Sequence, residues 1–208
     1  MVSMNNKERL EFIVRSTIMD RPRQIVVDAE YLSFDDKNRV SDVPTRFLRT
    51  EIEGLRYGVK SIRGYTFRIG RIYCIDVRDV TGRVINIRIK SLYRVRLKLL
   101  NQKYLAITNA LFQYYFHDIT RKYLAQFRDG KAVELLGVNL NSEGVLFDEK
   151  VGRVSWYFLG TKRYWHYYTL YSEEFPDKYR AFVFLDDWNA GVLRAVIEMI
   201  LKEKIPNR

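Results

Sequence analysis

The feature that most constrains the fold is a change of hydrophobic period in the middle of the chain. The segment 84–90 alternates regularly, with Ile85, Ile87 and Ile89 on one face and polar residues on the other. Such alternation is typical of a β-strand with one buried face. From about residue 102 to 127 the apolar residues instead recur at three- and four-residue spacing. This spacing predicts one long amphipathic helix, which Gly130 would end.

The second half of the chain repeats this order in a shorter form. Strands are predicted, and a last helix is expected after an Asp186-Asp187 cap. A local echo supports the repeat, because Glu30–Phe34 and Glu143–Phe147 occupy corresponding places in the two halves. The predicted strands of this half are 133–140, 144–147, 154–159, 164–171 and 180–185.

These patterns predict an α+β fold. The expected unit is a β-meander or partly open barrel capped by a C-terminal helix, and the unit is expected to occur twice. The predicted divisions are an N-terminal tail over residues 1–11, a basic domain over 12–130 and a smaller neutral domain over 131–208. The length of 208 residues suits one large domain or two small ones.

The order of elements resembles the pleckstrin-homology-like superfold, in particular its compact bacterial versions. Members often carry a Glu-Gly-aliphatic-x-Phe strand followed by an aromatic-rich strand, similar to Glu143–Phe147 followed by Val154-Ser155-Trp156. The resemblance covers most of residues 12–204 as a tandem pair, and it implies a binding or scaffolding module, since this superfold is rarely catalytic. The family's phosphoinositide site uses basic residues near the first hairpin, where this chain has Arg21 and Arg23.

The positive charge is concentrated in one segment. The whole chain has a formal net charge of +11. Residues 46–103 alone hold 15 basic and 4 acidic side chains, whereas residues 131–208 hold 11 of each. Arginine predominates in the basic segment, and it suits forked contacts to carboxylates and phosphates. The simpler alternative is that these side chains only keep exposed strand faces soluble.

We expect the basic segment to make the contact with a partner. Reversing Arg68, Arg78 and Arg88 to glutamate is expected to abolish binding with little change in the thermal midpoint. The predicted partner-binding residues are Arg63, Arg68, Arg71, Arg78, Arg88 and Lys90.

The sequence contains no recognisable catalytic or metal-binding constellation. Cys74 alternates with apolar residues and is expected to be a buried, inert thiol. His117 follows Phe116 in the predicted helix and cannot face the adjacent Asp118. A structural zinc site is improbable with one cysteine and two histidines. We therefore predict a protein that is not an enzyme and that holds neither metal nor cofactor.

The second histidine lies in an aromatic run, Tyr164–Tyr168. One interpretation is a strand with aromatic side chains in the core or at a protein interface. The alternative is a base-stacking platform, which needs interleaved positive charge. Only Lys162 and Arg163 supply such charge nearby.

The expected function is a binding module, an adaptor or an inhibitor of the immunity-protein type, that docks an acidic protein through its arginine-rich face. Binding of nucleic acid or of anionic lipid is the alternative. No apolar stretch is long enough to span a membrane and the start lacks a secretory h-region, so we expect a cytoplasmic protein.

Overall fold

The computed structural model describes residues 9–16, 20–36, 43–147 and 152–205. The chain combines antiparallel sheets with helices, so the α+β prediction is confirmed, and the described strands form no closed barrel. It divides into two compact units, residues 1–117 and 118–208. The division falls near the start of a helix, α2 (His117–Arg128), whose end adjoins the predicted boundary at residue 130.

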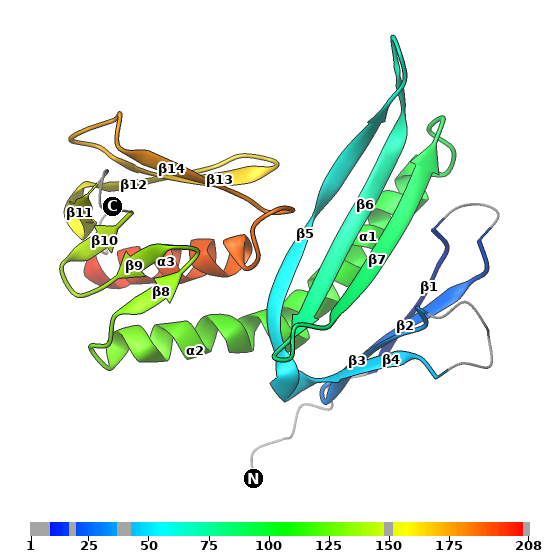
Figure 1. The fold of residues 1–208 in the computed structure, drawn as a ribbon, viewed down its shortest axis with the longest axis horizontal. Helices are drawn as coiled ribbons and strands as arrows, with labels where there is room; N and C mark the ends of the chain where they lie inside the picture. The colour runs from blue at the N-terminus through cyan, green and yellow to red at the C-terminus, as the bar shows by residue number, and fades with distance from the viewer. Residues whose placement is uncertain (1–8, 17–19, 37–42, 148–151, 206–208) are drawn as a thin grey trace. The chain divides into compact units, whose positions relative to one another are not determined.

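The first sheet of the first unit is a four-stranded antiparallel meander (Figure 1). Its strands are β1 (Leu10–Val14), β2 (Arg23–Val27), β3 (Tyr31–Phe34) and β4 (Thr45–Leu48). Asp28 shapes the turn between β2 and β3, because its carboxylate accepts a hydrogen bond from the backbone N–H of Glu30 at 2.9 Å. The side chains of this sheet that are 0% exposed are Ile25, Val27, Leu32 and Phe47.

A short 3-10 turn, η1 (Arg49–Glu51), leads into a three-stranded antiparallel meander. Its strands are β5 (Ile52–Arg63), β6 (Arg68–Asp79) and β7 (Val84–Leu92). The alternation predicted for β7 is confirmed, because the side chains of Ile85, Ile87 and Ile89 are at most 1% exposed.

The pairing of β5 with β6 slips by one residue near their hairpin turn. Ile62 pairs with Gly70, but Arg63 pairs with Arg68, so Ile69 is the additional residue on β6. The β-bulge therefore lies at Ile69, the residue before Gly70.

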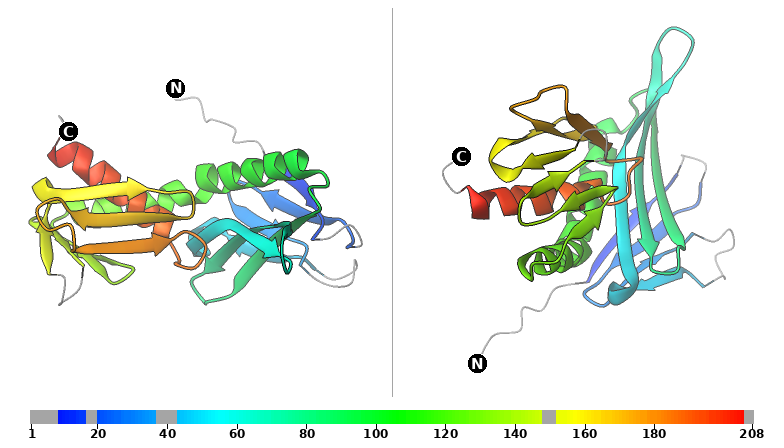
Figure 2. Two further views of the ribbon diagram at one scale, coloured as in Figure 1. Left: turned by 90° about the horizontal axis from the view of Figure 1, so that it is seen from above. Right: turned by 60° about the vertical axis from the view of Figure 1, so that its left-hand side comes forward.

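The long helix predicted over residues 102–127 is confirmed and begins earlier. It consists of α1 (Leu97–Leu111), a π-helical turn η2 (Phe112–Phe116) and α2. Within the first unit α1 runs alongside the strands (Figure 2). The ring of Tyr104 lies 5.1 Å from that of Tyr73 on β6, and the hydroxyl of Tyr115 donates to the carbonyl of Tyr31 at 2.6 Å. The helix is thus bonded to one sheet and packed on the other.

After α2, the second unit has the same order of elements as the first in shorter form: a four-stranded meander, a 3-10 turn, a three-stranded meander and a helix. The echo noted in the sequence falls at the third strand of each four-stranded sheet, since β3 matches β10. The elements are β8 (Val133–Leu135), β9 (Val138–Leu140), β10 (Gly144–Leu146), β11 (Arg153–Ser155), η3 (Trp156–Phe158), β12 (Leu159–Arg163), β13 (Tyr167–Ser172), β14 (Tyr179–Val183) and α3 (Ala190–Lys204).

The predicted aspartate cap of the last helix is wrong. Asn189 occupies the cap position of α3 with a left-handed backbone, φ 66°, and its side chain makes no capping hydrogen bond. The carboxylate of Asp187 instead accepts a hydrogen bond from the backbone N–H of Val183 at 2.7 Å. This contact closes the turn after β14, so the side chain faces the strand that it follows.

Candidate functional site

The predicted contact residues lie on the β5–β7 sheet of the first unit. One side of this sheet, with Tyr73, Ile75 and Val77, is buried in the core. The opposite side is called the outer face below, and the strand pairing aligns its residues in rows. Its side chains are those of Arg56, Lys60, Ile72, Cys74, Asp76, Arg78, Asn86, Arg88 and Lys90.

A buried carboxylate lies at the centre of the outer face. The side chain of Asp76 is 1% exposed and forms ion pairs with Arg56 at 2.9 Å and with Arg88 at 2.5 Å. The guanidinium of Arg88 also donates to the carbonyl of Ile87 at 2.9 Å. Because a buried carboxylate requires matched cations, these two arginines have a structural role on the sheet as well as a positive charge.

The expected reversal of Arg68, Arg78 and Arg88 without loss of stability must therefore be corrected. A glutamate at position 88 would place a second carboxylate beside the buried Asp76, and like charges in a low-dielectric site repel strongly. Arg78 in turn pairs with Glu53 at 2.9 Å. In the described part of the chain, Arg78 and Arg88 therefore each have an acidic partner within the first unit.

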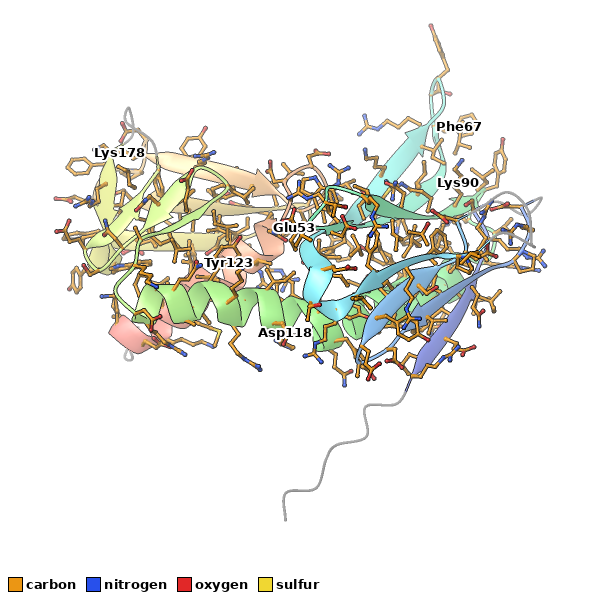
Figure 3. The ribbon with its side chains drawn as sticks, turned by 60° about the horizontal axis from the view of Figure 1, so that its bottom comes forward. Glu53, Phe67, Lys90, Asp118, Tyr123 and Lys178 are labelled. Atoms are coloured by element: carbon orange, nitrogen blue, oxygen red, sulfur yellow. The ribbon has the colours of Figure 1, made fainter. Side chains whose placement is uncertain are left out.

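Two lysines carry the accessible charge of the outer face. Lys60 and Lys90 are exposed, and both pair in register with Ile72 on the central strand. They lie two strand spacings apart, about 10 Å between backbones. Figure 3 labels Lys90 on β7. The sequence prediction included Lys90 but missed Lys60, although Lys60 lies in the same basic segment.

The remaining predicted residues are not brought onto the outer face. Arg63 is exposed at the end of β5, and Arg68 begins β6 opposite it. Arg71 pairs with Ser61 and Ser91 and shares the side of the sheet that carries Tyr73. The structure describes the backbone of Arg68 but not its side chain. The six predicted residues therefore divide among the outer face, the hairpin end and the opposite side.

The sequence prediction missed two aromatic side chains at the turn between β5 and β6. Tyr65 is 104% exposed and Phe67 is 61% exposed. From the sequence alone, Phe67 would be counted with Ile69 and Ile72 among the apolar positions of one strand. The sequence signal that could have identified its place in a turn is Gly64, three residues earlier, because glycine often marks a turn.

The nucleophilic and metal-ligating residues form no reactive cluster in the described residues. Cys74 is buried as predicted, and burial raises the pKa of its thiol even though Arg88 acts in the opposite direction. His117 and His166 are exposed and lie in different units. No group of three histidine, cysteine, aspartate or glutamate side chains in the described ranges is placed to hold a metal ion.

The aromatic run of the second unit is only partly a strand. Tyr164, Trp165 and His166 form the connection between β12 and β13, and Trp165 is 78% exposed there. The strand begins at Tyr167, whose ring stacks on that of Tyr164 at 4.4 Å, while Tyr168 is fully buried. Core packing therefore accounts for one aromatic residue, and the connection presents another to the surface.

Asp79 stabilises the turn of the β6–β7 hairpin. Its carboxylate is buried and accepts hydrogen bonds from the backbone N–H groups of Thr81 at 3.0 Å and Arg83 at 2.9 Å. It also pairs with the Arg83 guanidinium at 2.7 Å. Burial opposes ionisation of Asp79, but the hydrogen bonds from Thr81 and Arg83 outweigh it and lower the pKa of this carboxyl group below its ordinary value.

The lowered pKa of Asp79 predicts a loss of stability in acid. A carboxyl group whose folded pKa is depressed stabilises the fold above its unfolded pKa of about 3.9, and this contribution is lost as the pH falls through the folded value. We expect Asp79→Asn to lower the thermal midpoint at pH 7. The variant should also lose less of its midpoint than the wild type during acidification below a pH of about 4. Circular dichroism melting curves across this range test both expectations. An equal fall of the midpoint with pH in the variant and in the wild type would contradict them.

The chain finds no match among known protein families, curated proteins or solved structures. Among the residues that the structure describes, no helix is long and apolar enough to cross a membrane.

Proposed function

We propose that this chain is a non-enzymatic, cytoplasmic binding module that docks an acidic protein on the outer face of the β5–β7 sheet. The observation that carries this proposal is the arrangement around Asp76. One buried carboxylate is surrounded by Arg56 and Arg88, while Lys60 and Lys90 extend to solvent beside them. These four cations outnumber the one carboxylate that they surround, so this part of the face is positively charged, and the ion pairs hold the two arginines in place.

The segments around this face contain few acidic residues that could offset its positive charge. Residues 54–75 contain no acidic side chain, and neither do residues 80–117. A cluster of one sign of charge on a rigid sheet raises the association rate of acidic partners and disfavours basic ones. Because most of the outer-face side chains are charged or polar, this face suits a charged protein surface.

We propose further that both units are pleckstrin-homology-like. Each has a four-stranded meander, a three-stranded meander and then a helix, in that order. This order supports a tandem pair with a binding role, although a fold does not by itself imply a function. In this proposal the first unit supplies the charged contact, and the second unit carries a charge balance close to neutral.

The test is the double variant Lys60→Glu and Lys90→Glu in the full-length chain. Both side chains are exposed, so we expect the thermal midpoint to stay within about 2 °C of the wild type. The matched control is Lys122→Glu and Lys131→Glu, which makes the same change of net charge on exposed lysines of the second unit. Affinity for the acidic partner should fall at least about tenfold in the first variant and stay unchanged in the control.

The partner is obtained by native low-salt purification of the tagged chain from its source cell, with and without nuclease. An acidic protein that survives nuclease, and whose purified form loses affinity for the double variant only, would support the proposal. Equal loss in both variants would show that net charge alone acts. Retention of nucleic acid in place of protein would overturn the proposal in favour of phosphate binding.

A further inference from the structure

The hairpin between β5 and β6 extends beyond the third strand of its sheet. β7 ends at Leu92, which pairs with Gly70, so the pair beyond the bulge, Arg63 with Arg68, involves β5 and β6 alone. Figures 1 and 2 show this end of the hairpin projecting past β7. A hydrogen bond from the N–H of Gly64 to the carbonyl of Phe67, at 2.8 Å, closes the turn. Residues 63–68 are called the tip below.

The tip presents aromatic side chains to solvent. Tyr65 is as exposed as it would be in an unfolded chain, at 104%, and Phe67 is 61% exposed. Figure 3 shows Phe67 on this projecting hairpin. Two exposed aromatic side chains, two residues apart on a projecting hairpin, leave apolar surface in water, which is typical of an interaction site.

The loop after β7 adds apolar surface at the same end of the sheet. Its first residue, Tyr93, donates its backbone N–H to the carbonyl of Ile69 at 2.7 Å, so the loop is bonded to the base of the tip. Tyr93 is 70% exposed, and Val95 is 48% exposed. Apolar side chains therefore gather at this end from two separate segments of the chain.

The two segments that supply this apolar surface also carry positive charge. Arg63 flanks the turn, and a surface hollow beside Tyr93 is lined by Arg94, Arg96 and Lys98 together with Leu97, Leu99 and Gln102. As noted above, residues 54–75 and 80–117 contain no acidic side chain. Aromatic side chains with basic residues beside them match the interface of an anionic bilayer, where rings lie at headgroup depth and cations meet the phosphates.

The shape of the tip distinguishes a bilayer from other anionic partners. Single-stranded nucleic acid stacks on aromatic side chains that line a groove or a sheet. Tyr65 and Phe67 instead lie at the apex of a protruding two-stranded hairpin. Such a hairpin can insert its apex into a lipid bilayer, but it has no groove that could enclose a nucleic-acid strand. We propose that the tip attaches the first unit to an anionic membrane surface through Tyr65 and Phe67, assisted by the basic residues beside them. This contact is separate from the docking of an acidic protein on the outer face.

Cosedimentation of the full-length chain with vesicles tests this inference. One set of vesicles is phosphatidylcholine alone, and the other is equal parts phosphatidylcholine and phosphatidylglycerol. The wild type should bind the anionic set and not the neutral set. The variant Tyr65→Ser with Phe67→Ser keeps the net charge, and it should bind the anionic set roughly tenfold more weakly, because it has lost the side chains that become buried.

The matched control is Tyr179→Ser with Phe175→Ser, which removes the same two side-chain types from exposed positions of the second unit, 60% and 48% exposed. We expect this control to bind as the wild type does. Equal binding by the tip variant and the wild type, equal weakening in the control, or no vesicle binding by the wild type would each overturn the inference. Loss of binding to a single-stranded RNA probe in the tip variant, with vesicle binding unchanged, would assign the tip to nucleic acid instead.

A second measurement follows the tip itself. Phe67→Trp places an indole at the apex, and its emission should shift to shorter wavelength when anionic vesicles are added. The difference spectrum against the wild type removes the signal of the three tryptophans of the second unit. An unshifted difference spectrum contradicts insertion. The same tip variants should still capture the acidic protein, so failure of this inference and failure of the docking proposal give different results.

Discussion

Replacing Asp76 by asparagine is expected to lower the free energy of unfolding of the first unit by about 3 kcal/mol. The carboxylate is 1% exposed and holds Arg56 and Arg88 on the outer face. An asparagine of the same shape leaves two guanidinium groups facing a neutral amide, and removing one partner of a buried ionic cluster is much more costly than removing the whole cluster. Chemical denaturation of the full-length variant, followed by circular dichroism, measures the change.

The control for Asp76→Asn is Glu53→Gln. Glu53 pairs with Arg78 on the same sheet, but its side chain is 41% exposed, so we expect a change below about 1 kcal/mol. If the two variants are equally stable, the arginines of the outer face are held by their contacts with backbone carbonyls and not by the carboxylate. A variant that also replaces Arg88 by methionine should recover part of the stability lost in Asp76→Asn, because it removes one of the uncompensated cations.

The second large effect is expected at Gly144, where alanine should destabilise the second unit by about 3 kcal/mol. A Cβ atom built there would lie 2.2 Å from the carbonyl oxygen of Val154 and 2.9 Å from the Cα of Ser155. Both atoms belong to the backbone of β10's paired neighbour, β11, so no side chain can rotate away to relieve the contact. The strands must separate instead, which weakens a sheet of only three-residue strands.

Gly130→Ala provides the comparison. Gly130 follows the end of α2 with φ +75°, and no atom lies within 4 Å of a Cβ built there. Only the left-handed backbone then opposes the alanine, at a cost of about 1 kcal/mol. Thermal and chemical unfolding of the two variants should therefore differ clearly, and equal losses would show that β10 and β11 separate at little cost.

The sequence motif around Gly144 could be recognised, but the physical reason for its glycine could not be predicted from the sequence. The Glu-Gly-aliphatic-x-Phe strand was noted in the sequence as a family resemblance, without a reason for the glycine. The structure supplies a reason, because only a residue without Cβ permits the close approach of β11. The reason could not be predicted, since the approach involves Val154, ten residues away in the chain and on another strand.

The prediction of contact residues was limited in the same way. The surplus of basic residues over 46–103 is visible in the sequence, and so is the exposure expected of Lys90 in an alternating strand. Strand register decides which of these cations pair with a carboxylate of the same sheet. Asp76, Arg56 and Arg88 come from three separate strands, and the register brings Asp76 between the two arginines. Phe67 was missed for a related reason, because its exposure follows from the length by which β5 and β6 extend past β7.

The sequence by itself determined the α+β composition, the alternation of β7, the long helix and the concentration of positive charge. These properties depend on the period and the type of residues close together in the chain, and short-range patterns record them directly. Only the tertiary structure decided which arginines bind Asp76, why Gly144 must be glycine and where the aromatic tip projects. Each of these depends on the spatial meeting of strands distant in sequence, which hydrogen-bond register and packing establish together.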